Sequence, residues 1–407
     1  MRSGLLPMLL TLHAAIVIPL AAQQAGPRSP RIFQSDGADL AKVKQRLAMG
    51  DKQIAAAVAE LRVQAEPMLR TEPCTIVNRT KRAPSGDKHD YVSMAPYFWP
   101  DPDKKDGLPY IRKDGRVNPE REQYDAPLLQ KLSRTIGPLG LAYYLTGEER
   151  HAEHAARMLR VWFLDRDTRM NPHLKYAQFI PGITEGRGIG IIDSVAFLAV
   201  IDTVGLIEGS RSWSKTDQAG MKEWFTAYVQ WLRTSTNGKD EAAALNNHGS
   251  WYDVQLATFA LFIGEADDAV KKLLEESKAK RIARQIEPDG RQPLELRRTK
   301  SFDYSQGNLR ALFALATLGD RVGVDLWHFE TNDGRSIRKA LDWLIPYATG
   351  EKKWEHEQLG GVRGGSLAPL LRRAAVAYRN NRYENVLDKL SGRGDLGTAG
   401  LLYPNPR

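Results

Sequence analysis

Four polar side chains in the second half of the chain carry groups that could act together on a carboxylated substrate. Asn247 and His248 are adjacent and supply an amide and an imidazole, while Arg297 and Tyr304, seven residues apart, supply a guanidinium and a phenol. Such groups can hold a carboxylate and take the proton from the carbon beside it. No metal-ligand cluster, phosphate-binding loop or Ser/His/Asp signature competes with this set in the sequence.

The chemistry requires that the carboxylate be neutralised, because the proton beside a charged carboxylate is barely acidic. Donors from Asn247, His248 and Arg297 would stabilise the enolate-like transition state. A phenol beside a guanidinium ionises more readily than its ordinary pKa of about 10 allows. Tyr304 could therefore take the proton as a phenolate, or protonate the departing oxygen as a phenol. Arg298 is an alternative to Arg297, less favoured because it stands six residues from Tyr304.

Structural roles explain the same residues when each pair is taken alone. Asn247 is a suitable helix N-cap with a packed histidine behind it, and Arg297 belongs to a basic run of the kind that is usually solvated. A third polar segment has the same ambiguity. Its side chains suit sugar hydroxyls and a second carboxylate, but turn chemistry explains them equally well. They are Asn171, Tyr176, Gln178 and Arg187.

The elements that must position these residues are mostly helices. Apolar residues recur at helical spacing from Asp39 to about Leu69 and through most of the chain after residue 121. Helical pairs with short connections and few strand signals favour one all-α domain over residues 36–407, an α/α toroid or solenoid. Further helices are predicted at about 122–146, 148–164, 187–208, 214–236, 248–264, 266–283, 302–318, 334–349 and 365–391.

Residues 70–120 differ from the rest because prolines interrupt them throughout and exclude a long helix. Long irregular segments in compact domains are often lids or binding loops. Tyr97 and Trp99 could each stack on a sugar ring or simply anchor this segment, and Trp251, after His248, is a further aromatic candidate. We expect the segment to fold over one edge of a cleft.

The N-terminus has the composition of an export signal. In residues 1–22, Arg2 precedes a largely apolar run that ends in small residues suited to cleavage. The run is too short for a comfortable membrane span, and no second candidate span is evident downstream. Residues 23–35, rich in Pro, Gln and Ser, are predicted to be a linker. A periplasmic or secreted protein with no membrane in its mature form is expected, with a retained anchor as the alternative.

The formal charge of +9 and the isoelectric point near 9.4 suit a polyanionic partner. Basic residues are spread along the chain, which together with export favours an acidic polysaccharide over nucleic acid. A basic surface without a dedicated partner explains the charge equally well. Cys74 is the only cysteine, so no intrachain disulfide forms, and we expect an inert thiol. No cofactor is expected, and His173 and His356 give no metal-ligand spacing.

The combination of Asn247, His248, Arg297 and Tyr304 resembles the catalytic set of the alginate-lyase-type polysaccharide lyases. Segments 97–102, 107–111, 118–120 and 171–187 look like further signatures of that superfamily, so the resemblance covers roughly residues 85–380. It implies an incomplete α/α toroid with a deep cleft, and metal-independent β-elimination of a β-1,4-linked polyuronate. It implies that Asn247 and His248 lie at the substrate carboxylate and that Arg297 supports that site. It also implies that Tyr304 serves as the acid and often as the base.

One detail departs from that pattern, because Gly249-Ser250 follows His248 where the best-known alginate lyases carry Ser-Tyr. The uronate is therefore open, since relatives cleave mannuronate-rich alginate and others cleave glucuronan. Two other classes also stay open. A noncatalytic binding protein for the same polymer would need neither Tyr304 nor His248. An α/α-toroid glycoside hydrolase would need two opposed carboxylates, which the sequence does not pair among Glu185, Asp193, Asp253 and Asp303.

Overall fold

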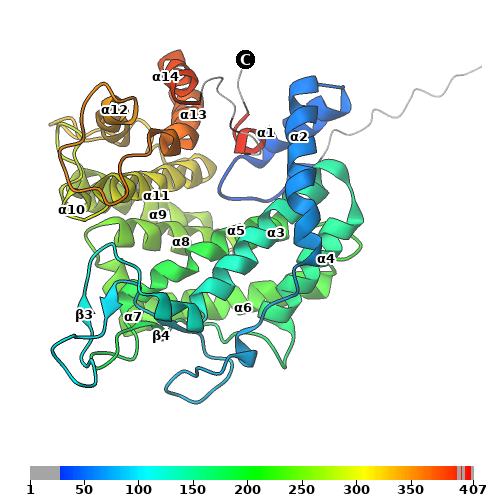
Figure 1. The fold of residues 1–407 in the computed structure, drawn as a ribbon. Coiled ribbons are helices and arrows are strands. Elements are labelled where there is room, and N and C mark those ends of the chain that lie inside the picture. Colours follow the sequence, from blue (N-terminus) through cyan, green and yellow to red (C-terminus); the bar gives the residue numbers. More distant parts are fainter. Residues whose placement is uncertain (1–27, 392–395, 397–398, 405–407) are drawn as a thin grey trace, which may run out of the picture.

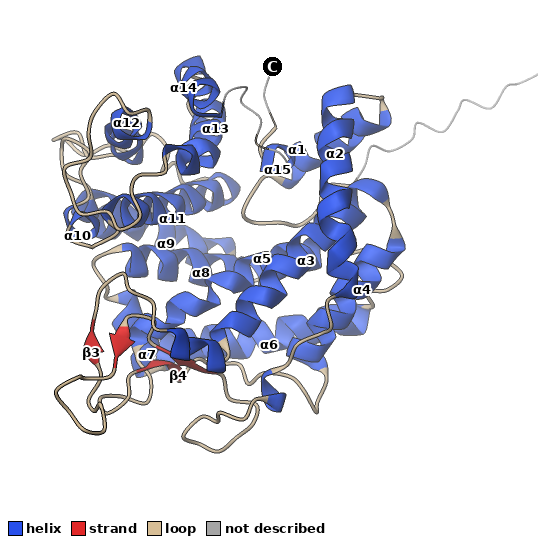
Figure 2. Cartoon of the chain, viewed as in Figure 1, coloured by secondary structure: helices blue, strands red, loops and turns tan. Residues whose placement is uncertain are grey.

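Helices build almost the whole molecule, and short strands appear only near one end of them (Figures 1 and 2). The computed structural model describes residues 28–391, 396 and 399–404, so the predicted signal peptide lies outside the described residues. Within the described part the strands form no closed sheet. The architecture is the expected all-α, incomplete α/α toroid.

The helices follow one another along the chain, and the long irregular segment separates the second α-helix from the third. The α-helices are α1 (Gly37–Ala48), α2 (Lys52–Ala65), α3 (Ala126–Thr146), α4 (Glu149–Leu159), α5 (Phe197–Ile207), α6 (Lys215–Thr234), α7 (Thr236–Ala242), α8 (Asn247–Ile263), α9 (Asp267–Ser277), α10 (Pro293–Leu296), α11 (Ser301–Val322), α12 (Ile337–Ala348), α13 (Ala368–Ala377), α14 (Asn381–Ser391) and α15 (Ala399–Leu402). The 3-10 segments are η1 (Glu66–Arg70), η2 (Ile76–Asn78), η3 (Pro119–Gln123), η5 (Gly188–Ala196) and η7 (Gly364–Leu367), and the π-helical segments are η4 (Arg160–Leu164) and η6 (Lys278–Ala283).

Amphipathic helices pack on their neighbours to make the toroid. In α3, Leu129, Leu132, Ile136 and Leu139 are buried at intervals of three and four residues, which places them on one face. Gly147, with a φ of 73°, adopts the left-handed conformation that ends this helix. Helix α3 packs on α4 and α5, and α8 packs on α6, α9 and α11. The helices that carry the candidate site residues are therefore held by neighbours along their length.

One hydrophobic core cluster extends through the fold from Ile32 to Leu401. By length and composition alone, the stretch Gly188–Ile207 could cross a membrane, but 61% of its most apolar window is buried inside the molecule. Phe197 in this stretch lies within 5.4–5.8 Å, between ring centroids, of three aromatic residues of α6. Packing in the toroid accounts for its apolar character.

Several helix boundaries differ from the sequence-based expectation for local reasons. The helix predicted over 39–69 is two helices, because Gly50 has a φ of 85° and the Asp51 side chain accepts from the first amides of α2. The helix predicted over 365–391 is divided at Tyr378–Asn380, where Arg379 has a φ of 48°. Helices α7 and α10 were not expected, because helices this short carry no periodic signal.

Four short strands join the irregular segment to the end of the toroid. Strand β1 (Val92–Met94) pairs in parallel with β4 (Tyr176–Phe179), and β2 (Phe98–Trp99) pairs antiparallel with β3 (Ile111–Arg112). In Figure 1 this part of the chain lies beside α7, α8 and α10 at one edge of the molecule. The lid-like segment is thus an ordered part of the fold.

The predicted linker, residues 23–35, enters the described part of the chain at Arg28 and is packed there. Ile32 and Phe33 are buried, and the Asp202 carboxylate accepts hydrogen bonds from the backbone amides of Phe33 and Gln34. Arg321 donates to the carbonyl oxygen of Ser35 at 2.9 Å. Residues 28–35 are therefore part of the toroid, because their backbone is bonded to α5 and α11.

Candidate active site

A cleft of about 510 Å³ opens where the irregular segment meets the first turns of α8 and α11. Its charged side chains are cationic, and none of the described residues that line it is acidic. A cationic cleft attracts an anionic ligand. The lining residues are Pro96, Tyr97, Phe98, Arg112, Gln178, Arg187, Ile189, Ile192, Asn246, Asn247, His248, Arg298 and Tyr304.

The N-terminus of α8 presents Asn247 to the cleft. Asn246 is the N-cap, and its side chain accepts from the His248 amide at 3.3 Å. Glu295, buried behind the turn, accepts from both the backbone amide and the side-chain amide of Asn247 at 2.7 Å. Burial raises the pKa of the Glu295 carboxyl, and the bonds from Asn247 act in the opposite direction. Glu295 fixes the orientation of the Asn247 amide, which keeps one N–H for a ligand.

His248 is held from behind by a carboxylate of the preceding helix. Its Nδ1 lies 2.7 Å from an oxygen of Glu241 in α7, and the Glu241 side chain is 1% exposed. A carboxylate acceptor at Nδ1 fixes the proton on that nitrogen and leaves Nε2 as the ring nitrogen for the cleft. The pair therefore sets both the tautomer and the orientation of the imidazole.

Tyr304 lies in the first turn of α11, with its hydroxyl in a chain of polar contacts. The hydroxyl accepts from Arg298 Nη2 at 2.7 Å and donates to the Tyr97 hydroxyl at 2.9 Å. The Arg298 guanidinium also lies 3.7 Å from the centre of the Tyr304 ring. The phenol thus has a cationic donor on one side and a second hydroxyl on the other.

Burial raises the pKa of Tyr304 well above its ordinary value of 10.0, and the Tyr97 hydroxyl adds to this rise, while Arg298 opposes it. The expectation that a neighbouring guanidinium makes Tyr304 easier to ionise is therefore wrong for the protein without substrate. Loss of solvation outweighs the attraction of the guanidinium for a phenolate. In the free protein Tyr304 is a neutral phenol that can donate a proton.

The guanidinium beside Tyr304 belongs to Arg298, which corrects the choice of Arg297. Arg297 follows the last residue of α10 and is exposed, and it is not among the lining residues. Arg298 is turned inward because Asp114 accepts from its Nε and Nη2 at 3.1 and 2.8 Å. Although burial opposes it, hydrogen bonding from Arg298, Thr299 and Arg112 holds the pKa of Asp114 well below its ordinary value.

Gln178 and Arg187 also line the cleft. Arg187 donates to the backbone oxygen and the side-chain oxygen of Gln178 at 3.1 and 3.0 Å, and it lies 5.3 Å from the centre of the Phe98 ring. Gln178 has a φ of 49°, a strained backbone position for a residue with a side chain. Burial lowers the pKa of Arg187 and Arg112 lowers it further, but a guanidinium keeps its charge.

Four predicted contacts lie outside the cleft lining. Asn171 donates to Asp87 and Asp90 in a surface loop, and Tyr176 is buried against Ala83 and Val92. The Trp99 indole donates to the Arg116 carbonyl oxygen at 2.9 Å and anchors the lid. Trp251 packs against the hydrophobic core. These four residues therefore have structural roles in turns and packing, whereas Tyr97 lines the cleft.

The carboxylates that a glycoside hydrolase would need are engaged elsewhere. Asp193 accepts from Tyr91, Ser93 and Gln178, and Asp253 pairs with Arg281. Neither they nor Glu185 and Asp303 line the cleft. In the described part of the chain, no group of three or more His, Cys, Asp or Glu side chains could hold a metal ion.

Five residues of the site were missed by sequence reasoning. Apart from Glu241, they reach the site through tertiary contacts that no sequence spacing reveals. The seven-residue interval between Glu241 and His248 was a usable signal, because it spans only the α7–α8 turn. The missed residues are Phe98, Arg112, Asp114, Glu241 and Glu295.

The helical toroid and its cationic cleft, with a phenol, a guanidinium, an imidazole and an amide, define the protein as a polysaccharide lyase. The family described as alginate lyase matches residues 75–354, and the chain therefore belongs to the alginate lyase family.

Solved structures agree with this assignment. An alginate lyase from Bacteroides ovatus is 41% identical, with a TM-score of 0.87 over 92% of this chain and 99% of that chain. Two tetrasaccharide complexes of alginate lyase A1-III, one a histidine-to-alanine and one a tyrosine-to-phenylalanine variant, share the fold with TM-scores of 0.54 at 17% and 16% identity. They cover 85% of this chain and 94% and 95% of theirs. No curated protein sequence matches this chain.

Proposed function

We propose that the protein cleaves alginate, a β-1,4-linked polyuronate, by β-elimination and leaves 4,5-unsaturated uronate ends. The proposal depends on one observation, namely that Asn247, His248, Arg298 and Tyr304 line a single cationic cleft. Membership of the alginate lyase family and the Bacteroides ovatus relative favour alginate over glucuronan. The tetrasaccharide bound to alginate lyase A1-III is consistent with an oligosaccharide-sized ligand.

The carboxylate of the reacting sugar is neutralised at the N-terminus of α8. The Asn247 amide, held by Glu295, supplies a preorganised donor at this end of the helix, and His248, held by Glu241, turns its Nε2 to the same cleft. As the proton leaves the adjacent carbon, charge moves onto the carboxylate oxygens and the hydrogen bond from Asn247 strengthens. The proposed steps use side chains alone and require no metal.

Tyr304 protonates the departing glycosidic oxygen. Its neutral hydroxyl and the Arg298 guanidinium face the same cleft, so the proton can be delivered where negative charge develops. When the proton and the leaving oxygen lie on one face of the sugar, Tyr304 can be the base only as a phenolate, so it must first release its own proton to solvent when substrate binds and then pass the abstracted proton to the leaving oxygen. For the epimer whose proton lies on the other face, His248 Nε2 is the candidate base.

Arg187 and Arg112 bind the carboxylate of a neighbouring sugar unit. Both line the cleft, and neither touches the Tyr304 hydroxyl. We also propose that the protein is exported, since a signal-like N-terminus suits an enzyme whose polymeric substrate lies outside the cell.

Absorbance of the unsaturated product tests the proposal directly. The purified protein is mixed with alginate, polymannuronate, polyguluronate and glucuronan, and the ultraviolet absorbance of the conjugated double bond is followed. We expect absorbance to rise on alginate and to be abolished, by at least about 1,000-fold in kcat, in Tyr304→Phe. Absence of a product signal on all four polymers would refute a lyase.

A binding assay separates the lyase from a noncatalytic binding protein. Tyr304→Phe removes only the hydroxyl, so it should bind an alginate oligosaccharide about as tightly as the wild type. If the wild type and Tyr304→Phe bind the oligosaccharide equally and the wild type forms no double bond, the noncatalytic binding function is supported instead.

A further inference from the structure

A buried ion pair lies directly behind the backbone of His248. Arg281 in η6 donates from Nε and Nη2 to the two carboxylate oxygens of Asp253 in α8 at 2.8 and 3.0 Å. Both side chains are 4% exposed, and Ser277 donates to the same carboxylate at 2.9 Å. Burying two charges is costly, so a pair of this kind is weak evidence of a role in stability alone.

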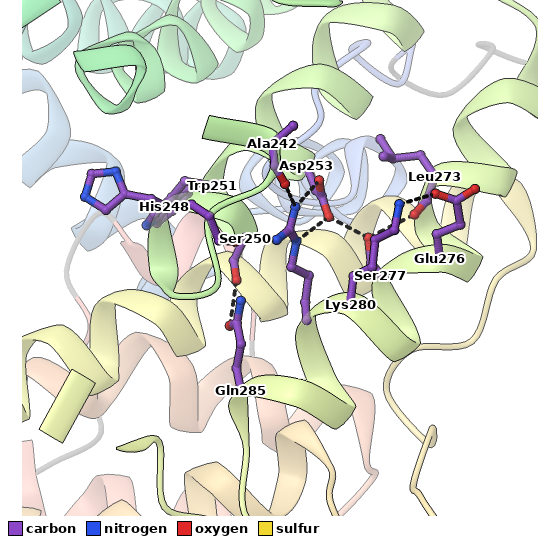
Figure 3. A network of polar contacts seen from close by, with 12 residues as sticks. Ala242, His248, Ser250, Trp251, Asp253, Leu273, Glu276, Ser277, Lys280 and Gln285 are labelled. Carbon is purple, nitrogen blue, oxygen red and sulfur yellow. Dashed lines mark hydrogen bonds and ion pairs between the residues drawn. The ribbon is translucent and has the colours of Figure 1, made fainter. Parts of the chain in front are cut away.

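The same guanidinium binds the turn that leads into α8. Its Nη2 donates to the Ala242 carbonyl oxygen at 2.8 Å, and its Nη1 donates to that of Ala244 at 2.7 Å. Ala242 ends α7, so the positive charge also lies at the negative end of that helix dipole. In Figure 3, His248 points away from Asp253 and Ser277, which places this network behind the imidazole.

Gly249 allows the guanidinium to approach so closely. A Cβ at this position would overlap Arg281 Nη1 and the Ala244 carbonyl oxygen, well inside van der Waals contact. Gly249 directly follows His248 and departs from the pattern of the best-known alginate lyases. The glycine is therefore a steric requirement of the contact between the Arg281 guanidinium and the Ala244 carbonyl oxygen.

We propose that Arg281, oriented by Asp253 and admitted by Gly249, is a positioning residue for His248. It ties the end of α7, which carries Glu241, to Asp253 in the second turn of α8, the helix that carries His248, and so maintains the 2.7 Å contact between the Glu241 and His248 side chains. Arg281 does not line the cleft and acts only through the imidazole. The inference rests on the proposed function of His248.

Gly249→Ala tests the proposal, because one methyl group must displace the guanidinium and the Ala244 carbonyl oxygen that it binds. We expect kcat on alginate to fall by roughly 10- to 100-fold, with KM within about threefold of wild type. The low-field NMR signal of the His248 Nδ1 proton should shift or disappear. Gly137→Ala is the matched control, since a Cβ there meets nothing within 4 Å and the glycine lies in helix α3. It should leave both readouts unchanged.

A second substitution removes the arginine itself. Arg281→Ala breaks the bonds to Ala242 and Ala244 without placing an atom against the Ala244 carbonyl oxygen, so it should lower kcat and shift the Nδ1 signal as Gly249→Ala does, whereas wild-type values for both in folded Arg281→Ala would overturn the proposal. Arg281→Lys keeps the charge but not the planar fork and should also lower kcat, which provides a test if Gly249→Ala does not fold. Wild-type kcat and an unshifted Nδ1 signal in folded Gly249→Ala or Arg281→Lys would equally refute it.

The NMR signal also separates this proposal from the proposed function. The signal can be recorded without substrate. If the wild type is inactive and the signal changes in Gly249→Ala, the lyase function is refuted and the positioning role of Arg281 is supported. If the wild type is active and the signal is unchanged in Gly249→Ala, the lyase function is supported and the positioning role is refuted.

Discussion

Tyr304, the proposed proton donor, lies half-buried in the cleft with its hydroxyl bonded to Tyr97 and Arg298. Because burial raises its pKa above 10.0, the neutral phenol persists at every pH below that value. We predict that Tyr304 contributes no tyrosinate absorbance between pH 7 and about 10. Spectra of the wild type minus Tyr304→Phe measure this directly. A phenolate appearing near pH 8 would mean that Arg298 outweighs burial.

The two adjacent arginines provide a matched pair for testing the site. Arg298 donates to Tyr304 and is held by Asp114, whereas Arg297 is exposed outside the cleft. Arg298→Ala should lower kcat by roughly 100-fold or more, because the transition state loses a positive charge. Arg297→Ala should remain within about threefold of wild type. Steady-state kinetics on alginate measure both variants. A larger loss of kcat in Arg297→Ala than in Arg298→Ala would show that Arg297, not Arg298, belongs to the site.

The irregular segment is joined to the proposed catalytic residue Arg298 through Asp114. This carboxylate binds Arg298 and accepts from the amide and hydroxyl of Thr299 at 3.2 and 3.1 Å. We predict that Asp114→Asn lowers kcat by about tenfold and increases proteolysis within residues 100–118, because a charge-assisted contact is lost.

Asp106→Asn is the control for that substitution, since Asp106 is an exposed turn residue of the same segment whose side chain accepts from the Leu108 amide. If proteolysis of the irregular segment is unchanged in Asp114→Asn, or if both substitutions change it equally, Asp114 does not hold that segment against the cleft.

Helix α6 begins with a capping box in which Ser214 and Asp217 bond to each other's backbone amides. Hydrogen bonds from Arg160 and Ser214 lower the pKa of Asp217 to about 2, from 3.8. A lowered folded-state pKa contributes stability above pH 3.8 that is lost as the pH falls towards 2. Asp217→Asn should cost roughly 1 to 2 kcal/mol of unfolding free energy at pH 7, with the difference vanishing near pH 2.

Urea unfolding at several pH values measures that cost. Asp39→Asn, which breaks the exposed pair with Lys42, serves as the control and should change little. A pH-independent difference for Asp217→Asn would mean that the ionised carboxylate is not the stabilising group.

Sequence patterns predicted the toroid because its long helices bury a periodic apolar face, as α3 does. They also placed Asn247, His248 and Tyr304, whose types and order are characteristic. The choice between Arg297 and Arg298 needed the structure. The segment between α10 and α11 is not helical, so sequence spacing there does not determine which arginine side chain points into the cleft. Glu241 and Glu295 escaped because buried carboxylates have no pattern until their partners are known.

At the scale of the whole molecule, net positive charge and a cleft lined by Arg112, Arg187 and Arg298 should concentrate a polyanion. We predict that KM for alginate rises several-fold between about 0.05 and 0.5 M salt while kcat changes little, since screening acts within about 10 Å at 0.1 M. Arg112→Gln should flatten this dependence. A KM that does not respond to salt would assign binding to uncharged contacts.

The packing of residues 28–35 has a consequence for how the chain is made. This segment bonds to Arg321 of α11, and the carbonyl oxygen of Gln34 accepts from the Tyr403 hydroxyl just beyond α15, which lies against α1 and α2 (Figure 2). Among the described residues, those synthesised first therefore contact those synthesised last. A nascent chain can stack α3 to α9 as they appear, but the contact between its two ends forms only after synthesis has passed Tyr403.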